Sequence, residues 1–136
     1  MRSIEPDARA TGGSSPGNRF VLLEHTGHPD DPTGRHYDLL LEEPADCQTW
    51  RLAEIPTTDG PTVAATLLPA HRLAWLDTEA AAVSGGRGFA RRVAAGCYKH
   101  LPIAASDTAI EVRVLLAGGQ FSGTLEITAR GLAKLR

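Results

Sequence analysis

The feature that most constrains this chain is the alternation of short apolar stretches with loops rich in glycine, proline and aspartate. In the run RHYDLLLEE, a two-residue period places His36, Asp38 and Leu40 on one face and Tyr37 and Leu39 on the other. No stretch has the period of an amphipathic helix longer than two turns. About six to eight strands joined by short loops predict an all-β fold, a small closed or nearly closed antiparallel β-barrel with short helical turns.

The expected strands follow from apolar runs bounded by turn residues. We place them at residues 19–25, 35–43, 47–55, 63–68, 89–98, 110–116 and 120–130. The Gly118-Gly119 pair is typical of a hairpin leading into the last of these. Ser84, Gly85, Gly86 and Gly88 indicate a tight loop.

A chain of 136 residues is expected to have one core. Residues 1–18 are rich in Gly, Ser, Pro and charge, which predicts a disordered tail ahead of a domain at residues 19–136. The longest apolar runs are far too short to cross a bilayer, and the N-terminal residues lack the apolar stretch of a secretory signal. We therefore expect a cytoplasmic protein, a monomer with no membrane association.

Charge and cysteine usage exclude some classes of protein. The net charge of −2 does not by itself predict nucleic-acid binding, although the basic residues concentrate after residue 86 and permit a locally basic face. Cys47 and Cys97 have no CxxC partner, which argues against a zinc knuckle and against a disulfide scaffold. We interpret both as small buried hydrophobic residues.

Histidines and an aspartate supply the only convincing chemical centre. The H-x-D spacing puts His36 and Asp38 on one strand face, and His25 can approach from the neighbouring strand. Neutral imidazoles with a carboxylate suit Mn, Fe or Zn, and three protein ligands leave positions open for water or substrate. The spacing alone is equally consistent with a hydrogen-bonded pair of His36 and Asp38 that binds no ion. His28 is an alternative to His25 as the first ligand.

The order of several segments resembles a known family. These are RFVLLEH, RHYDLLLE, TWRL, PAHRLAWLDTEAAAVSGGRGFARRVAAGCY and GGQFSGTLEITA. Together they resemble the 3′-phosphoesterase domain of bacterial DNA ligase D, a member of the DNA polymerase/ligase N-terminal-type family. The resemblance spans about residues 19–130.

This resemblance implies a β-barrel enzyme that processes DNA 3′ ends at breaks, as a 3′-phosphatase or by trimming a 3′-terminal ribonucleotide. It implies Mn²⁺, or another divalent transition metal such as Zn²⁺, bound by His25, His36 and Asp38, with His71 contacting the phosphate. DNA 3′ ends, and separate repair ligase or polymerase proteins, are the implied partners.

The sequence also departs from the family. Leu40, Val63 and Trp75 stand where the family carries two arginines and a tyrosine, and the loop between His25 and His36 is longer. An arginine at position 40 is expected to raise phosphoesterase activity.

Arg87 in the SGGRG turn is a candidate substitute, because an arginine fork matches phosphate oxygens. Two other functions stay open. One is a module that binds nucleic-acid ends or supports a repair complex without catalysis. The other is a non-haem iron oxygenase, since two histidines and a carboxylate also form that type of site.

Overall fold

The structure is a computed structural model that describes residues 18–136. The tail predicted at residues 1–18 lies outside the described residues, apart from Asn18. Nine strands and one short 3₁₀ helix occur in the described part. They are β1 (Arg19–Thr26), β2 (Arg35–Glu42), β3 (Cys47–Leu52), β4 (Val63–His71), η1 (Leu73–Asp77), β5 (Ala80–Ala82), β6 (Phe89–His100), β7 (Ile110–Ala117), β8 (Gly123–Thr128) and β9 (Leu132–Leu135).

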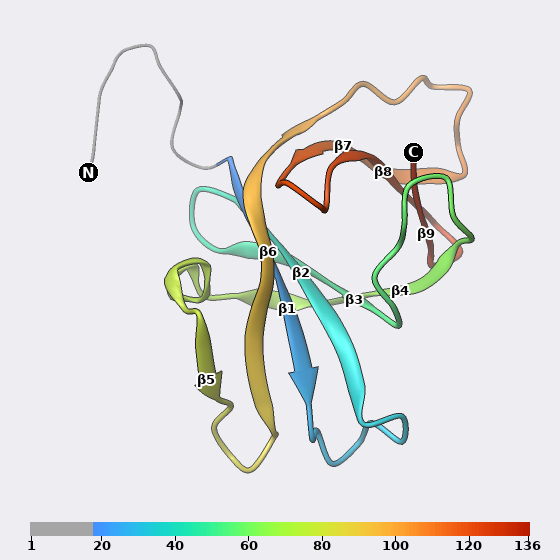
Figure 1. The fold of residues 1–136 in the computed structure, drawn as a ribbon. Helices are drawn as coiled ribbons and strands as arrows, with labels where there is room; N and C mark the ends of the chain where they lie inside the picture. Colours follow the sequence, from blue (N-terminus) through green and yellow to red (C-terminus); the bar gives the residue numbers. More distant parts are fainter. Residues whose placement is uncertain (1–17) are drawn as a thin grey trace, which may run out of the picture.

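The strands form one antiparallel sheet in the order β1-β2-β3-β4-β9-β8-β7-β6-β5. An additional pairing between β1 and β6 joins the two sides into a ring, with β5 left outside on the edge of β6 (Figure 1). The pairing around the ring is shortest between β4 and β9, which share two residue pairs. The predicted all-β, nearly closed antiparallel barrel is confirmed.

Two apolar clusters lie on opposite faces of β1 and β2. Phe20 and Leu22 point into the barrel, whereas Val21 and Leu23 point outward. The outward residues form a second cluster with Leu40, Cys47 and Leu76, and η1 covers it. We call this second group the outer cluster, and the face of the sheet that carries it the outer face. Its members are Val21, Leu23, Leu40, Cys47 and Leu76, with Leu73 and Trp75 packed against them.

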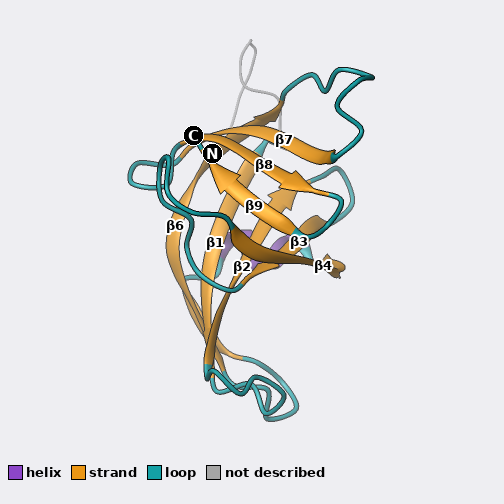
Figure 2. Cartoon of the chain, turned by 90° about the vertical axis from the view of Figure 1, so that its right-hand side faces the viewer, coloured by secondary structure: helices purple, strands orange, loops and turns teal. Residues whose placement is uncertain are grey.

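One end of the molecule is an extension of β1, β2 and β6 beyond the barrel body (Figures 1 and 2). The loop at residues 27–34 and the tight loop at residues 84–88 both close this end. Gly88 has a φ of 92°, and a Cβ at this position would lie 2.0 Å from the carbonyl oxygen of Thr26. Only glycine therefore lets the second loop pack against the end of β1.

Some predicted boundaries were wrong. β3 ends at Leu52, and the predicted strand at residues 120–130 begins only at Gly123. β5 and β9 were not predicted. Gly131, with a φ of 84°, turns the chain after β8 so that β9 pairs with both β8 and β4.

Cys47 is fully buried, as expected, but Cys97 is exposed. Its position on β6 lies opposite Arg19 at the start of β1. No helix in the described chain is long and apolar enough to cross a membrane.

Candidate metal centre

Strand pairing brings the three predicted ligands together at the extended end. His25 on β1 lies directly opposite His36 on β2, and Asp38 follows two residues later on the same face. The exposed fractions of the three residues are 6%, 4% and 5%. One donor atom from each lies within 4.8 Å of the other two. The group could therefore hold one metal ion, and it lies on the outer face next to the outer cluster.

The outer ring nitrogen of each histidine is already engaged. His25 Nε2 lies 2.7 Å from the carbonyl oxygen of Arg87, and His36 Nδ1 lies 2.9 Å from Oδ2 of Asp31. A carbonyl and a carboxylate only accept hydrogen bonds, so the protons of the neutral imidazoles are on these two nitrogens. The same contacts orient both rings in the way that partners of metal-bound histidines do.

The inner nitrogens consequently face each other as lone pairs. His25 Nδ1 and His36 Nε2 are 3.0 Å apart. Burial lowers the pKa of His36 below its usual value and so favours the neutral ring, although the hydrogen bond that His36 donates to Asp31 acts in the opposite direction. Two lone pairs at this distance repel unless a cation, either a proton or a metal ion, lies between them.

Asp38 completes the donor set. Its Oδ2 lies 3.8 Å from His25 Nδ1, and its Oδ1 lies 3.9 Å from His36 Nε2. Oδ1 is buried and has no hydrogen-bond partner within residues 18–136. A buried carboxylate oxygen left in this way is costly, and cation binding would satisfy it. The residues present thus fit a divalent transition metal, and they do not by themselves select which one.

The long loop between the two histidines provides Asp31. Its Oδ1 accepts hydrogen bonds from the backbone and the hydroxyl of Thr33, at 3.0 and 2.6 Å. The Thr33 hydroxyl and then His36 lower the pKa of the Asp31 carboxyl to about 2. The carboxylate is therefore ionised at neutral pH and holds His36 Nδ1. Asp31 was not predicted as part of the site, because the DDPTG segment is typical of an ordinary loop.

His28 lies beside the site and outside the ligand group. Its ring centroid is 5.6 Å from that of His25, and its Nδ1 accepts a hydrogen bond from the Asp30 backbone. His25, whose Nδ1 points to His36 and Asp38, is the better-placed ligand.

His71 is not brought to the metal centre. On β3, Arg51 lies opposite Asp38, while His71 on β4 lies opposite Cys47, four residues away from Arg51. At about 3.3 Å per residue this separation is ~13 Å along the strand. The His71 ring also bonds the carbonyl of Pro69 in its own strand.

Arg87 reaches the centre through its backbone. Its carbonyl binds His25, but its guanidinium folds back onto Ser84, with Nε 2.7 Å from the backbone oxygen and Nη2 2.9 Å from the hydroxyl. In this arrangement the Arg87 carbonyl positions the candidate metal ligand His25, and the Arg87 side chain points to its own turn.

Leu40, Trp75 and Val63, which differ from the family that the sequence resembles, have packing roles. Leu40 is fully buried in the outer cluster, and Trp75 packs on the same cluster. Val63 belongs to the barrel interior, on the face away from the metal centre. An arginine at position 40 would place a charge in this cluster, so the expectation that it raises activity is not compatible with the packing.

Arg51 is a further neighbour of the centre, and it was not predicted from the sequence. Its Nε lies 3.5 Å from Oδ1 of Asp38, across the β2–β3 pair. The TWRL motif placed Arg51 on a strand, but only the register puts it opposite the carboxylate.

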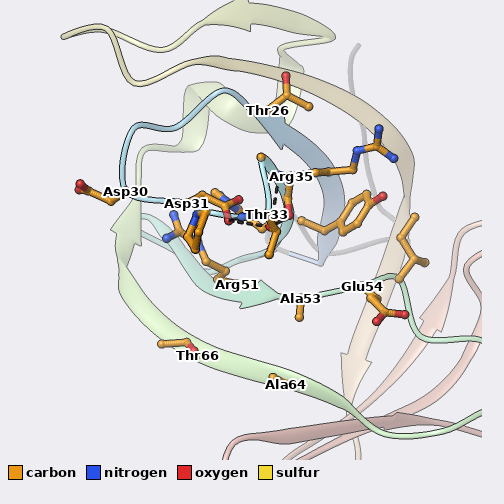
Figure 3. Close-up of a pocket in the computed structure, with 15 residues that line it drawn as sticks. Thr26, Asp30, Asp31, Thr33, Arg35, Arg51, Ala53, Glu54, Ala64 and Thr66 are labelled. Atoms are coloured by element: carbon orange, nitrogen blue, oxygen red, sulfur yellow. Dashed lines mark hydrogen bonds and ion pairs between the residues drawn. The ribbon is translucent and has the colours of Figure 1, made fainter.

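A cavity of about 890 Å³ opens next to the centre, between the β1–β2 loop and the β3–β4 pair (Figure 3). His36 and Arg51 line it, together with Asp31, Thr66 and Glu54. Of the three candidate ligands His36 lines this cavity, so a molecule in it would approach from the β3 side the face of β2 that carries His36 and Asp38, which we call the metal face.

Comparison with known proteins identifies no family. No protein-family model matches the chain, and no curated protein matches it significantly.

Proposed function

We propose that this protein is a metal-dependent phosphoesterase that processes DNA 3′ ends in break repair. The observation that carries the proposal is the pair of inner imidazole nitrogens of His25 and His36, 3.0 Å apart beside a buried carboxylate oxygen with no hydrogen-bond partner. This donor set suits a divalent transition metal, and we propose Mn²⁺, with Zn²⁺ as the alternative. The resemblance in the order of the strand motifs supplies the reaction class.

The proposed reaction is the hydrolysis of a 3′-phosphomonoester. A water oxygen attacks phosphorus, the bond from phosphorus to the 3′ oxygen breaks, and that oxygen takes a proton to give a 3′-hydroxyl and inorganic phosphate. A divalent cation, when bound, polarises a phosphoryl oxygen and offsets the charge that develops on it. Asp31 and the Arg87 carbonyl hold the two imidazoles in place, and the cavity beside His36 leaves room for the 3′ terminus.

The test is phosphate release from a DNA primer-template that ends in a 3′-phosphate, with Mn²⁺ present. We expect release by the wild-type protein and none by His36→Ala. His100→Ala is the matched control, because His100 is exposed and lies at the far end of β6 from the metal centre. Metal content of each variant is measured in parallel.

A second function has its own supporting observation. At the family positions, Leu40 provides neither a charge nor a hydrogen-bond donor for a phosphate, and Trp75, which packs against the outer cluster, has no hydroxyl. A protein that binds 3′-phosphorylated ends tightly, with metal present and without turnover, would be an end-binding module of a repair complex. Absence of both metal binding and end binding would contradict both functions.

A further inference from the structure

We propose that Arg51 forms a binding subsite for one terminal phosphate group, at the point where the cavity meets the metal face. This inference rests on the proposed phosphoesterase function and names the group that would hold the substrate. It also fixes the direction of approach, because the phosphate would enter from the side of β3 and β4.

The side chain of Arg51 is suited to an incoming anion. Its Nε is buried and has no hydrogen-bond partner in the described chain, while 34% of the side chain is exposed. Its one close ionic neighbour is Asp38, at 3.5 Å, too long for a well-formed hydrogen bond. A phosphate oxygen is a ligand that a planar guanidinium binds through two parallel hydrogen bonds.

The other arginines around the centre have hydrogen-bond or ion-pair partners away from the metal ligands. Their partners are as follows: Arg35 and Arg91 pair with Glu24, Arg87 bonds Ser84, and Arg92 pairs with Glu79 and with the Leu76 carbonyl. Among the described residues Arg35, like Arg51, has only a long ion pair, at 3.6 Å, but it lies on the opposite face of β2 from His36 and Asp38. Arg51 is therefore the arginine with a weakly engaged guanidinium on the same face as the metal centre.

The opposite side of the centre is sealed. Two residues beyond Asp38 on the same face, Leu40 is fully buried under Leu76 of η1. The cavity lies on the other side, where Arg51 and its cross-strand partner Thr66 form part of the wall. Figure 3 shows these two residues on neighbouring strands. A phosphate that contacts the metal face from solvent would consequently pass Arg51.

Charge favours a single phosphate at this place. Because Asp38 also belongs to the metal-binding group, its charge would be shared with the cation, and the guanidinium would keep a net positive charge toward the cavity. Asp30, Asp31 and Glu54 also line the cavity, whereas its second arginine, Arg35, is paired with Glu24. The wall thus lacks the run of free basic groups that a chain of several phosphates requires.

The test is titration of the Zn²⁺-loaded protein with inorganic phosphate, and separately with thymidine 3′-monophosphate, by calorimetry. We expect Arg51→Gln to weaken phosphate binding by about tenfold to a hundredfold while the zinc content is unchanged. Arg51→Lys, which keeps a point charge and loses the fork, should fall between the two. Arg35→Gln is the matched control at the cavity wall and should bind phosphate like the wild type.

Several outcomes would overturn the subsite. These are wild-type protein that binds no phosphate, Arg51→Gln that binds it normally, and Arg51→Gln that loses zinc. The melting temperature of each variant shows whether it is folded. If Arg51→Gln is not folded, the phosphate affinity of Arg51→Lys is compared with that of the wild type instead.

Turnover of 3′-phosphorylated DNA separates this inference from the proposed function. Arg51-dependent phosphate binding without turnover would support the subsite and contradict the enzyme. Turnover that is equal in wild type and Arg51→Gln would support the enzyme and contradict the subsite.

Discussion

The carboxylate of Asp31 lies 2.9 Å from Nδ1 of His36, and through this contact a loop residue determines which nitrogen of a buried histidine faces the metal centre. Thr33 holds the other carboxylate oxygen with two hydrogen bonds. The aspartate is therefore fixed before any ion binds. Such outer partners raise the basicity of the ligand ring and restrict its rotation.

Asp31→Asn is predicted to weaken metal binding by about tenfold to a hundredfold, because the neutral amide orients and polarises the ring less well. Competition with a chelator of known affinity measures the change. Asp30→Asn is the control, since Asp30 lies in the same loop and the carboxylate that His36 bonds is that of Asp31. Equal metal affinities for the two variants would show that Asp31 is not a supporting group.

Metal removal is predicted to lower stability. A ligand that binds only the folded state at a hundredfold excess over its Kd stabilises by about 2.7 kcal/mol. The melting temperature should therefore rise with Mn²⁺ or Zn²⁺ and return with EDTA. His25→Ala should show no such rise, while His100→Ala should respond like the wild type. A rise of the same size in His25→Ala would place the ion elsewhere.

The alternation of side chains along RHYDLLLEE was sufficient to predict that His36 and Asp38 share a face, because residues two positions apart in a strand point to the same side. The prediction that His25 joins them needed the pairing of β1 with β2, which a short connecting loop favours.

Long-range register was not predictable in the same way. Arg51 lies opposite Asp38, and His71 lies about four residues away, only because of how β3 and β4 pair, and a bulge shifts that register between Cys47 and Thr49. The alternation of side chains within one strand does not tell which residues of a neighbouring strand lie opposite them. The hydrogen bond from His25 to the Arg87 carbonyl likewise joins residues 62 positions apart.

Leu40→Arg is predicted to destabilise the fold by about 3–5 kcal/mol, because it leaves an unpaired charge in the outer cluster. Urea unfolding followed by tryptophan fluorescence measures the loss. Leu67→Arg is the control: Leu67 is 51% exposed on β4, and the change should be within about 0.5 kcal/mol. A stable and more active Leu40→Arg would restore the expectation from the family pattern.

His71→Ala is predicted to keep wild-type metal affinity and wild-type phosphate release, since the register separates His71 from Asp38 by ~13 Å along the strand. The comparison variant is His36→Ala, which should lose both. A large fall in turnover for His71→Ala at unchanged metal content would instead show that η1 and the end of β4 move toward the centre when substrate binds.

The two cysteines are predicted to differ in reactivity. Burial, followed by the charge of Glu42, raises the pKa of the Cys47 thiol to about 11, whereas Cys97 is exposed. At pH 8 a disulfide reagent should therefore modify Cys97 quickly and Cys47 only on unfolding. The Cys97→Ser variant isolates the buried thiol.

The sign of the pH effect follows from the same shift. The unfolded thiol ionises near its ordinary pKa of about 9, and the folded one only near 11, so the folded state holds more protons between these values. The stability of Cys97→Ser should fall as the pH rises through this window, and replacing Cys47 with alanine as well should remove that component. Fast labelling of Cys47 in the folded protein at pH 8 would show that the outer cluster opens readily and that η1 does not seal this side of the metal centre.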